Sequence, residues 1–569
     1  NFNHRARWII QGSVSGDGDS IDLPLYEVGI SGENQVAQIS DTGLSVNSCY
    51  FFDKEGEVVR DRSATVDTAR RKVIQYYAKK SSEDEGGHGT HCAGTILGKA
   101  CPYGDAGCST LSNRDGVAPA AKIAVYDVAN SGKYLSPDFS NPMFVHGRTA
   151  GATVHSASWG NGANSYSYRD LDYDRFQHQH DDFLVVFAAG NGGRNNRKHT
   201  SGSVAKNNLN VCASTNKGSR MGELYAAAFS SMGPSADGRI KPDICAPGQG
   251  ISSANKGANR QCNSVLKSGT SMACPGVAGA ALLVRQYFVE GFSPSGTRVP
   301  ADGFEPSGAL VKAVILNSGR VMLGRDNGSN GAPVFLSTEF DESQGFGLIS
   351  LVDGLYLREK SKGQVRVWDR EPLTSGQAWT KSFVLGACRA AHTSITLTYF
   401  DKENSSTACY PCLVNRLDLT VEKDGVTYYP NGRTGADVVN NSQRVRLPHA
   451  AKDVLTVKVR AANLATADQK FALVISGCLD TDVGVTKPTA GPTAPPTSSP
   501  TYAPTLLPTF LTASPTGFPT LLPTFLTSSP TEFPTLTPTK SPTSSPTRSP
   551  TLLPTKSPTS PPTKSPTLL

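Results

Sequence analysis

Four short segments carry side chains that could together form an acyl-transfer site. Asp41 ends a predicted strand, His88 lies in a Gly-His-Gly-Thr-His run, Asn191 follows an apolar run, and Ser271 opens a predicted helix. A serine hydroxyl becomes an effective nucleophile when a base takes its proton, and a histidine can do so near neutral pH. Asp41 can orient that imidazole, and the Ser271 N–H and the Asn191 amide can stabilise an oxyanion. The sequence therefore predicts nucleophilic catalysis by Ser271 with His88 as the base.

The elements needed to hold these segments are those of a layered α/β fold. Between residues 35 and 283, short β-branched runs alternate with longer segments of helical apolar spacing. This alternation predicts a three-layer, doubly wound parallel sheet with helices on both faces. After Ser271 the apolar residues step by three or four, which predicts a buried helix with Pro275 in its first turn. The other predicted elements are strands over 36–40, 122–128, 153–158, 183–189 and 209–214, and a helix over 307–317.

The pattern of residues 364–480 predicts strands alone, separated by Gly, Asn and Asp turns. Such a run of short strands is typical of a small all-β sandwich or barrel. We therefore expect a catalytic α/β domain over 1–355, a β domain over 364–480 and a tail over 484–569. The strands predicted for the β domain are 365–367, 394–399, 417–421, 444–447, 454–459 and 471–475.

The tail differs in composition from the rest of the chain. It holds 21 of the 38 prolines, all within Pro488–Leu569, and the nine residues PTLLPTFLT occur twice, starting at Pro504 and Pro519. A segment so rich in Pro, Thr and Ser buries too little apolar surface to fold, so we expect it to be disordered. Of the net charge of +7, four charges belong to the tail. The remaining +3 is too small a bias to indicate nucleic-acid binding.

The order Asp, His, Ser, at separations of 47 and 183 positions, resembles that of the subtilase family of serine proteases. The resemblance implies the subtilisin-like fold and peptide hydrolysis through an acyl-enzyme. It also implies a triad of Asp41, His88 and Ser271, Asn191 in the oxyanion hole, polypeptide substrates and chemistry that requires no cofactor. The motifs that carry it are Asp-Thr-Gly at 41–43, His-Gly-Thr-His-Cys-Ala-Gly at 88–94, Ala-Ala-Gly-Asn at 188–191 and Gly-Thr-Ser-Met-Ala at 269–273.

Further motifs resemble the bacterial alkaline subtilases that carry a C-terminal β-barrel. They are Ala-Arg-Trp-Ile-Ile-Gln at 6–11, Ser-Trp-Gly at 158–160, Gln-Gly-Phe-Gly-Leu at 344–348 and Leu-Val-Asn-Arg-Leu-Asp-Leu at 413–419. This resemblance implies structural calcium, although the metal ligands are unknown. Arg416 stands where these relatives usually have an acid, so a calcium site in the β domain is not expected to carry over unchanged.

Ser158, Trp159 and Gly160 are expected to bind substrate, as a wall of the primary specificity pocket whose backbone pairs with the peptide. The alternative is that Trp159 only packs in the core. His91 lies three residues after His88, whereas zinc-binding helices space their histidines four apart next to an acid. We therefore interpret His91 as a structural residue.

Twelve cysteines and three glycosylation sequons, at Asn327, Asn404 and Asn440, are compatible with secretion. Cys101 with Cys108 and Cys388 with Cys478 are expected to pair. Cys409 and Cys412 form either a local disulfide or two separate bridges, and Cys92 and Cys274 are interpreted as buried thiols. No apolar run approaches the length of a membrane span, so none is expected. We expect a secreted monomer.

Two alternatives to a working protease remain open at this stage. One is a pseudo-enzyme that keeps only the fold. The other is a surface-interaction protein in which the tail, extended as polyproline II and carrying O-glycans, is a stalk or cell-wall tether. The basic residues of the tail could bind an anionic extracellular polymer. In the reading favoured by the motifs, the tail only places a catalytic domain.

Overall fold

The computed structural model describes residues 2–12, 23–54, 56–63, 65–79, 82–102, 108, 111–130, 134–135, 138, 140–160, 164–193, 202–216, 222–257, 260–328, 332–336 and 339–480. The chain divides into two units at Lys487, and Asn1–Lys487 form one compact unit. The predicted tail over 484–569 lies outside the described residues. The domain boundaries at 355, 364 and 480 stay predictions.

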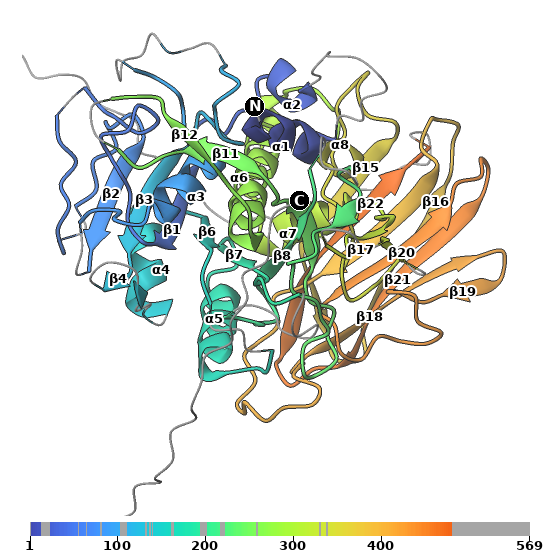
Figure 1. Ribbon diagram of the computed structural model, residues 1–569. Coiled ribbons are helices and arrows are strands. Elements are labelled where there is room, and N and C mark those ends of the chain that lie inside the picture. The colour runs from blue at the N-terminus through green and yellow to red at the C-terminus, as the bar shows by residue number, and fades with distance from the viewer. Residues whose placement is uncertain are drawn as a thin grey trace, which may run out of the picture. The chain divides into compact units, whose positions relative to one another are not determined.

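The first part of the chain forms a ten-stranded sheet in the order β14-β13-β9-β8-β7-β6-β1-β3-β2, with β10 also paired to β8 (Figure 1). The pairs from β2 to β8, together with β8–β10, are parallel, as predicted. The pairs β8–β9 and β13–β14 are antiparallel, so the sheet is mixed, not wholly parallel. The strands are β1 (Val36–Asp41), β2 (Val73–Ala78), β3 (Lys122–Asp127), β6 (Val154–Ala157), β7 (Leu184–Ala188), β8 (Leu209–Ser214), β9 (Tyr225–Ala226), β10 (Ile244–Pro247), β13 (Gly324–Arg325) and β14 (Val334–Phe335).

Helices cover both faces of this sheet, because successive residues of a strand point to opposite sides. On β7, Val186 packs in the same core as α3 and α6, whereas Val185 and Phe187 pack with Phe144 of α4 and residues of α5. The two cores explain why the strands are apolar runs without alternation. The helices are α1 (Phe2–Gln11), α2 (Pro24–Glu27), α3 (His88–Leu97), α4 (Ser140–Thr149), α5 (Tyr168–Gln179), α6 (Thr270–Val289), α7 (Gly308–Asn317) and α8 (Leu351–Gly354), with a 3-10 turn at Pro300–Asp302.

Helix α6 is the predicted buried helix after Ser271, and Figure 1 shows it in the middle of the α/β part. Its length and hydropathy would suffice to cross a membrane, yet 94% of the apolar window is buried inside the protein. Among the described residues it is the one helix that passes this test, which core helices also pass. The two small sheets beside the main one are β11 (Ile251–Ala254) with β12 (Ser264–Lys267), and β4 (Ala129–Asn130) with β5 (Tyr134–Leu135).

Residues 364–480 form two antiparallel four-stranded sheets, β15-β22-β17-β20 and β16-β21-β18-β19. Their facing sides share one core, so this part is a sandwich and not a barrel. On β22, Leu473 and Ile475 pack in the sandwich while Ala472 and Val474 pack in the core of the α/β part. The strands are β15 (Gln364–Thr374), β16 (Ala378–Val384), β17 (His392–Thr398), β18 (Arg416–Lys423), β19 (Val426–Tyr428), β20 (Ser442–Pro448), β21 (Val454–Asn463) and β22 (Asp468–Gly477).

The strands missing from the sequence prediction are β2, β10, β11, β12, β16 and β19, besides the two-residue strands. Strand β10 contains a cysteine and a proline, and β19 has three residues, so neither gives a periodic apolar signal. Strand β16 alternates Trp379, Lys381 and Phe383 with smaller residues, but most of it is exposed or half-buried.

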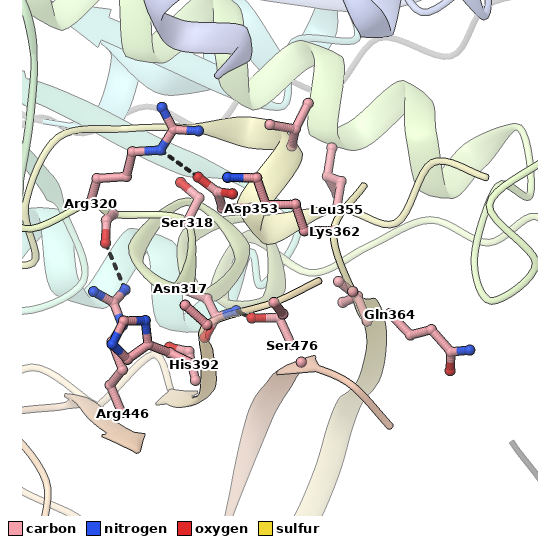
Figure 2. A pocket seen from close by; sticks show the side chains of 18 residues that line it. Asn317, Ser318, Arg320, Asp353, Leu355, Lys362, Gln364, His392, Arg446 and Ser476 are labelled. Atoms are coloured by element: carbon pink, nitrogen blue, oxygen red, sulfur yellow. Dashed lines mark hydrogen bonds and ion pairs between the residues drawn. The ribbon is translucent and has the colours of Figure 1, made fainter. Parts of the chain in front are cut away.

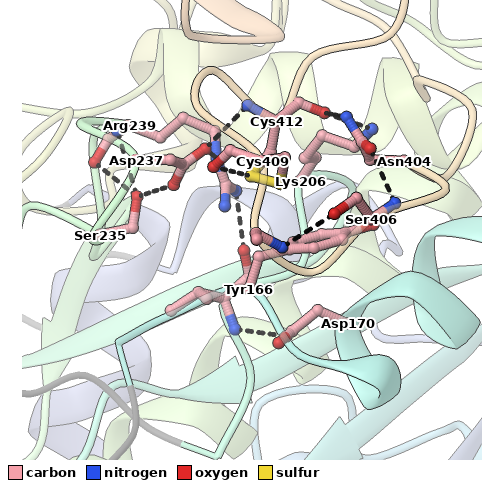
Figure 3. The surroundings of a disulfide bond; sticks show 12 residues. Tyr166, Asp170, Lys206, Ser235, Asp237, Arg239, Asn404, Ser406, Cys409 and Cys412 are labelled. Carbon is pink, nitrogen blue, oxygen red and sulfur yellow. Dashed lines mark hydrogen bonds and ion pairs between the residues drawn. A yellow bond between two sulfur atoms is a disulfide. The ribbon is translucent and has the colours of Figure 1, made fainter.

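Five disulfides connect the described cysteines. Three agree with the sequence prediction: Cys101–Cys108, Cys388–Cys478 and the local bridge Cys409–Cys412 shown in Figure 3. The bridges Cys49–Cys262 and Cys212–Cys245 were not predicted. Cys92 and Cys274 are free and buried, as expected.

Candidate active site

Asp41 and His88 are held together where β1 ends and α3 begins. The His88 Nδ1–H donates to Asp41 Oδ1 at 2.7 Å, and the Thr42 N–H donates to the same oxygen at 2.8 Å. Asp41 is only 2% exposed. The nearby carboxylate raises the pKa of His88 well above its usual value, because it stabilises the imidazolium. Since Nδ1 carries the bonded proton, Nε2 is the nitrogen left to accept one.

Gly89 allows this close approach of α3 to β1. A Cβ added at position 89 would lie 2.1 Å from the carbonyl oxygen of Gly43 and 3.1 Å from the Cβ of Asp41. Any side chain there would therefore push His88 away from its carboxylate.

Asp84 fixes the backbone on both sides of the pair, a role that the sequence analysis missed. Its Oδ1 accepts from the Thr42 hydroxyl at 2.8 Å and from the Gly87 N–H at 2.7 Å. Its Oδ2 accepts from the N–H and the hydroxyl of Thr90, at 2.7 and 2.6 Å. Asp84 is buried, so these four bonds replace its hydration. The sequence signal that could have indicated this role was an acidic residue four positions before the His-Gly-Thr-His motif.

We expect Asp84→Asn to lower kcat about 10- to 100-fold, because an amide offers one acceptor oxygen where four donors converge. Steady-state kinetics on a peptide substrate, with the circular dichroism spectrum as a check of folding, measures this effect. Glu85→Gln is the matched control, since Glu85 is exposed in the same loop. Unchanged kcat in Asp84→Asn would contradict the positioning role.

Ser271 is the second residue of α6 and is half-buried. Its hydroxyl donates to the carbonyl oxygen of Ser158 at 3.1 Å, and its own carbonyl accepts from the Ser158 hydroxyl at 3.2 Å. The Cys92 thiol, one turn after His88 on α3, also donates to the Ser271 carbonyl at 3.2 Å. These contacts hold the start of α6 against β6 and α3, so that Ser271 lies at the helix N-terminus near His88.

Asn191 is oriented by the residue before Ser271. The amide oxygen of Asn191 accepts from the Thr270 N–H at 2.9 Å and from the Thr270 hydroxyl at 3.2 Å. The amide nitrogen is thereby left to donate, as an oxyanion-hole residue must. Gly269 leaves the Asn191 amide nitrogen accessible to an oxyanion, because a Cβ at position 269 would lie 3.4 Å from that nitrogen.

Trp159 is a core residue in this structure. It is 8% exposed, and its indole N–H donates to the carbonyl and to the hydroxyl of Ser40, each at 3.0 Å. Buried His155 supports Ser40, because burial lowers the pKa of His155 to about 3 and its neutral Nε2 accepts from the Ser40 hydroxyl. The Trp159 side chain thus packs in the core, and a role for it in substrate binding stays a prediction. Substrate pairing by the backbone of Ser158 and Gly160 stays a prediction.

Asp127 is a buried acid beside the triad and takes no assigned part in catalysis. It ends β3 in register with Asp41, its Oδ1 accepts from the Ala129 N–H at 2.9 Å, and its Oδ2 accepts from the Tyr76 hydroxyl at 3.2 Å. Burial, with smaller contributions from the charges of Asp84 and Asp41, raises the pKa of Asp127 from 3.8 to about 7. Between about pH 4 and pH 7 the folded protein therefore holds a proton that the unfolded chain has lost.

This proton makes the free energy of unfolding fall as the pH rises from about 4 to 7. Asp127→Asn cannot titrate, so we expect the variant to gain at least about 2 °C in Tm relative to wild type between pH 5 and pH 8. Thermal unfolding across this range measures the difference, with the exposed Asp302→Asn as control. Parallel Tm curves for Asp127→Asn and wild type would show that Asp127 is ionised throughout.

The other candidate ligands give no separate metal site. Buried His91 donates from Nε2 toward the carbonyls of Ile251 and Val265, and burial lowers its pKa to about 4, as for a structural residue. Within the described ranges, the cluster with metal-binding spacing is Asp41, His88 and Cys92, which consists of two triad residues and the buried thiol one turn after His88.

The calcium site implied by resemblance does not fit the residues at 413–419. The guanidinium of Arg416 binds both carboxylate oxygens of Asp418, at 2.7 and 2.9 Å. A cation thus already occupies the place where an acid was expected, so no calcium is assigned there.

Comparison with known proteins agrees with this geometry. The profile of the subtilase family matches residues 32–347, more than half of the chain, so the chain belongs to the subtilase family, as predicted. It is similar to the serine protease/ABC transporter B family protein tagD of Dictyostelium discoideum, with 28% identity over 76% of this chain and 29% of that protein. It is also 29% identical to alkaline protease 1 of Emericella nidulans, over 48% of this chain and 56% of that protein.

Among solved structures, the prenylagaramide maturation protease PagA matches with 18% identity and a TM-score of 0.40, over 58% of this chain and 96% of that chain. The chain spans less than a third of the length of tagD and of the related tagA and tagB.

Proposed function

We propose that this chain is a serine endopeptidase with Asp41, His88 and Ser271 as its triad. The observation that carries the proposal is the buried Asp41–His88 hydrogen bond at the end of β1, next to a helix that begins at Thr270 and carries Ser271. Because the hydrogen bond keeps a proton on Nδ1, the free Nε2 of neutral His88 can take the Ser271 proton, and Asp41 stabilises the imidazolium that forms.

In the proposed reaction the Ser271 oxygen attacks the carbonyl carbon of a peptide bond while its proton passes to His88. The Asn191 amide and the Ser271 N–H, which lies at the positive end of the α6 dipole, stabilise the oxyanion. His88 then gives its proton to the leaving amine, and the acyl-enzyme forms. Water, activated by His88, releases the second product and restores Ser271. Asp41 stabilises the imidazolium in both steps.

A fluorophosphonate probe tests this proposal directly. We expect the probe to label residue 271 of the native protein and to give no label in Ser271→Ala or in heat-unfolded protein. Peptide mapping of the labelled chain identifies the modified residue. A folded protein that hydrolyses peptides but carries the label on another residue would refute the assignment, and a folded protein that takes no label would favour the pseudo-enzyme.

We also propose that the enzyme acts outside the cell and that its tail tethers it. Ten described cysteines are in disulfides, which supports an oxidising compartment. Of the three sequons, Asn327 is exposed, whereas the side chain of Asn440 is buried and bonded to Asp437 and Ile240. Asn327 is therefore the best candidate for a glycan.

Deletion of residues 488–569 tests the tether. We expect the truncated enzyme to cleave soluble peptides at the rate of the full chain and to lose retention on the cell-wall fraction. Retention of the full chain should fall as the salt concentration rises, because the basic tail residues would contact anionic groups. If the deletion abolished peptide cleavage, the tail would be more than an accessory.

A further inference from the structure

A cavity of about 200 Å³ lies away from the triad, between the end of α7, α8 and the first sheet of the sandwich. Figure 2 shows Arg320 and Asp353 on one wall and Arg446 with His392 on the other. Lys362 and Ser394 also line it. A cavity of about 150 Å³ can hold a benzene molecule, so this one has room for a small organic molecule.

The walls carry more positive than negative charge. Arg320 Nε is paired with Asp353 Oδ2 at 2.6 Å, which balances one charge. Arg446 and buried Arg444 share a single carboxylate, Glu339, at 3.1 and 2.7 Å. Burial, and then the charge of Arg446, lower the pKa of Arg444 to about 9, as expected for guanidiniums that one acid does not fully compensate.

Lys362 adds a second uncompensated charge. It is exposed at the rim, and within the described part of the chain its ammonium group makes no hydrogen bond or ion pair. Of the residues that line the cavity, Arg320, Lys362 and Arg446 are cations and Asp353 is a carboxylate, whereas Arg444 and Glu339 are not lining residues. A surplus of about two positive charges disfavours a metal ion and favours an anion.

Ser394 offers a hydrogen bond that no group in the described part of the chain takes. Its residue is 4% exposed and its hydroxyl oxygen is fully buried, without a partner. A buried unpaired hydroxyl is costly, and a bound acceptor would remove that cost. His392, exposed at the rim of the same cavity, is a further donor. The cavity therefore combines unused donors with unused positive charge.

We propose that this cavity binds a small oxyanion, as a free inorganic ion or as the phosphate or carboxylate group of a small metabolite. Lys362 and Arg446 supply the charge, and Ser394 donates a hydrogen bond from the floor. Because these residues come from the segment before β15, from β20 and from β17, a bound oxyanion holds these parts of the sandwich together, in the cavity that Arg320 also lines. Occupancy stabilises the folded enzyme.

Thermal unfolding of the full-length protein, inhibited with a serine-directed reagent, tests the proposal. Sodium phosphate, sulfate, acetate and citrate are compared with sodium chloride at equal ionic strength. We expect at least one oxyanion to raise Tm with a saturable, one-site dependence, which isothermal titration calorimetry should reproduce. Phosphate and sulfate acting alone would identify a tetrahedral ligand, and acetate or citrate acting alone a carboxylate.

Matched variants separate binding in the cavity from general salt effects, which are not saturable. We expect Lys362→Met to weaken oxyanion binding about tenfold and Ser394→Ala about threefold. Lys458→Met, an exposed lysine of the other sheet, should bind as wild type does. The proposal is wrong if no oxyanion gives a saturable rise, if Lys362→Met binds unchanged, or if only calcium chloride stabilises the protein.

Discussion

Ser271→Ala is expected to lower kcat for a peptide substrate by about 10⁶-fold, because the variant lacks the hydroxyl that forms the proposed acyl-enzyme. Within the described residues the Ser271 hydroxyl makes one hydrogen bond, to the Ser158 carbonyl. Its loss should therefore leave Tm within about 2 °C of wild type. The residual rate reflects the Asn191 amide and substrate binding, which the variant retains. Steady-state kinetics measures kcat, and thermal unfolding measures Tm.

Ser375→Ala is the control, since Ser375 is exposed in the turn after β15. The double variant Ser271→Ala/His88→Ala should be no slower than Ser271→Ala alone, because each proposed proton transfer by His88 belongs to forming or hydrolysing the Ser271 acyl-enzyme. A further large loss in the double variant would show that His88 has a role independent of Ser271. Cleavage at the wild-type rate by Ser271→Ala would contradict the proposed mechanism altogether.

The parts of the site that the sequence predicted are those that short motifs carry. Asp41, His88 and Ser271 lie next to glycines, at the end of a strand or the start of a helix, so their local sequence indicates their position. Gly89 illustrates the reason: only a residue without Cβ lets α3 approach β1 so closely. A steric requirement of this kind restricts the residue type at one position, so the sequence indicates it.

The parts that the sequence could not predict depend on contacts between distant segments. Trp159 lies beside Ser158 in the chain, yet its indole is buried because Ser40, from another strand, accepts its N–H. The Cys49–Cys262 bridge spans 213 residues. Spacing along the chain predicts neither contact, because both depend on the order of the strands in the sheet. Strand β16 was missed for a local reason, since its residues are mostly exposed and lack a strong apolar period.

Sequence spacing also fails to predict the ion pairs buried between the α/β part and the sandwich. Lys206 is fully buried and lies near the Cys409–Cys412 bridge (Figure 3). Its ammonium group binds Asp401 Oδ2 at 2.6 Å and the carbonyl oxygen of Cys412 at 3.2 Å. Asp174 lies 3.9 Å from the same nitrogen. Asp401 in turn accepts from the backbone of the loop that carries the Cys409–Cys412 bridge, at Val414 and Asn415. One lysine thus fastens this loop to the α/β part.

Lys206→Met is expected to lower the free energy of unfolding by about 3 to 5 kcal/mol and Tm by about 10 °C. The methionine fills the space but leaves Asp401 and Asp174 buried without their cation, and an unpaired buried charge is the costly outcome. Lys402→Met, an exposed neighbour, is the control and should change Tm by less than about 1 °C. Calorimetry or denaturant unfolding measures both.

A second substitution distinguishes loss of charge balance from loss of packing. If the stranded carboxylate causes the damage, Lys206→Met/Asp401→Asn should recover part of the lost stability, because the amide is neutral and still offers an oxygen to the Val414 or Asn415 N–H. If Asp401→Asn lowered the free energy of unfolding of Lys206→Met by as much as it lowers that of wild type, the two groups would not be coupled. The buried pair would then be an ordinary packing contact, and the loop at 401–415 would depend on other bonds for its position.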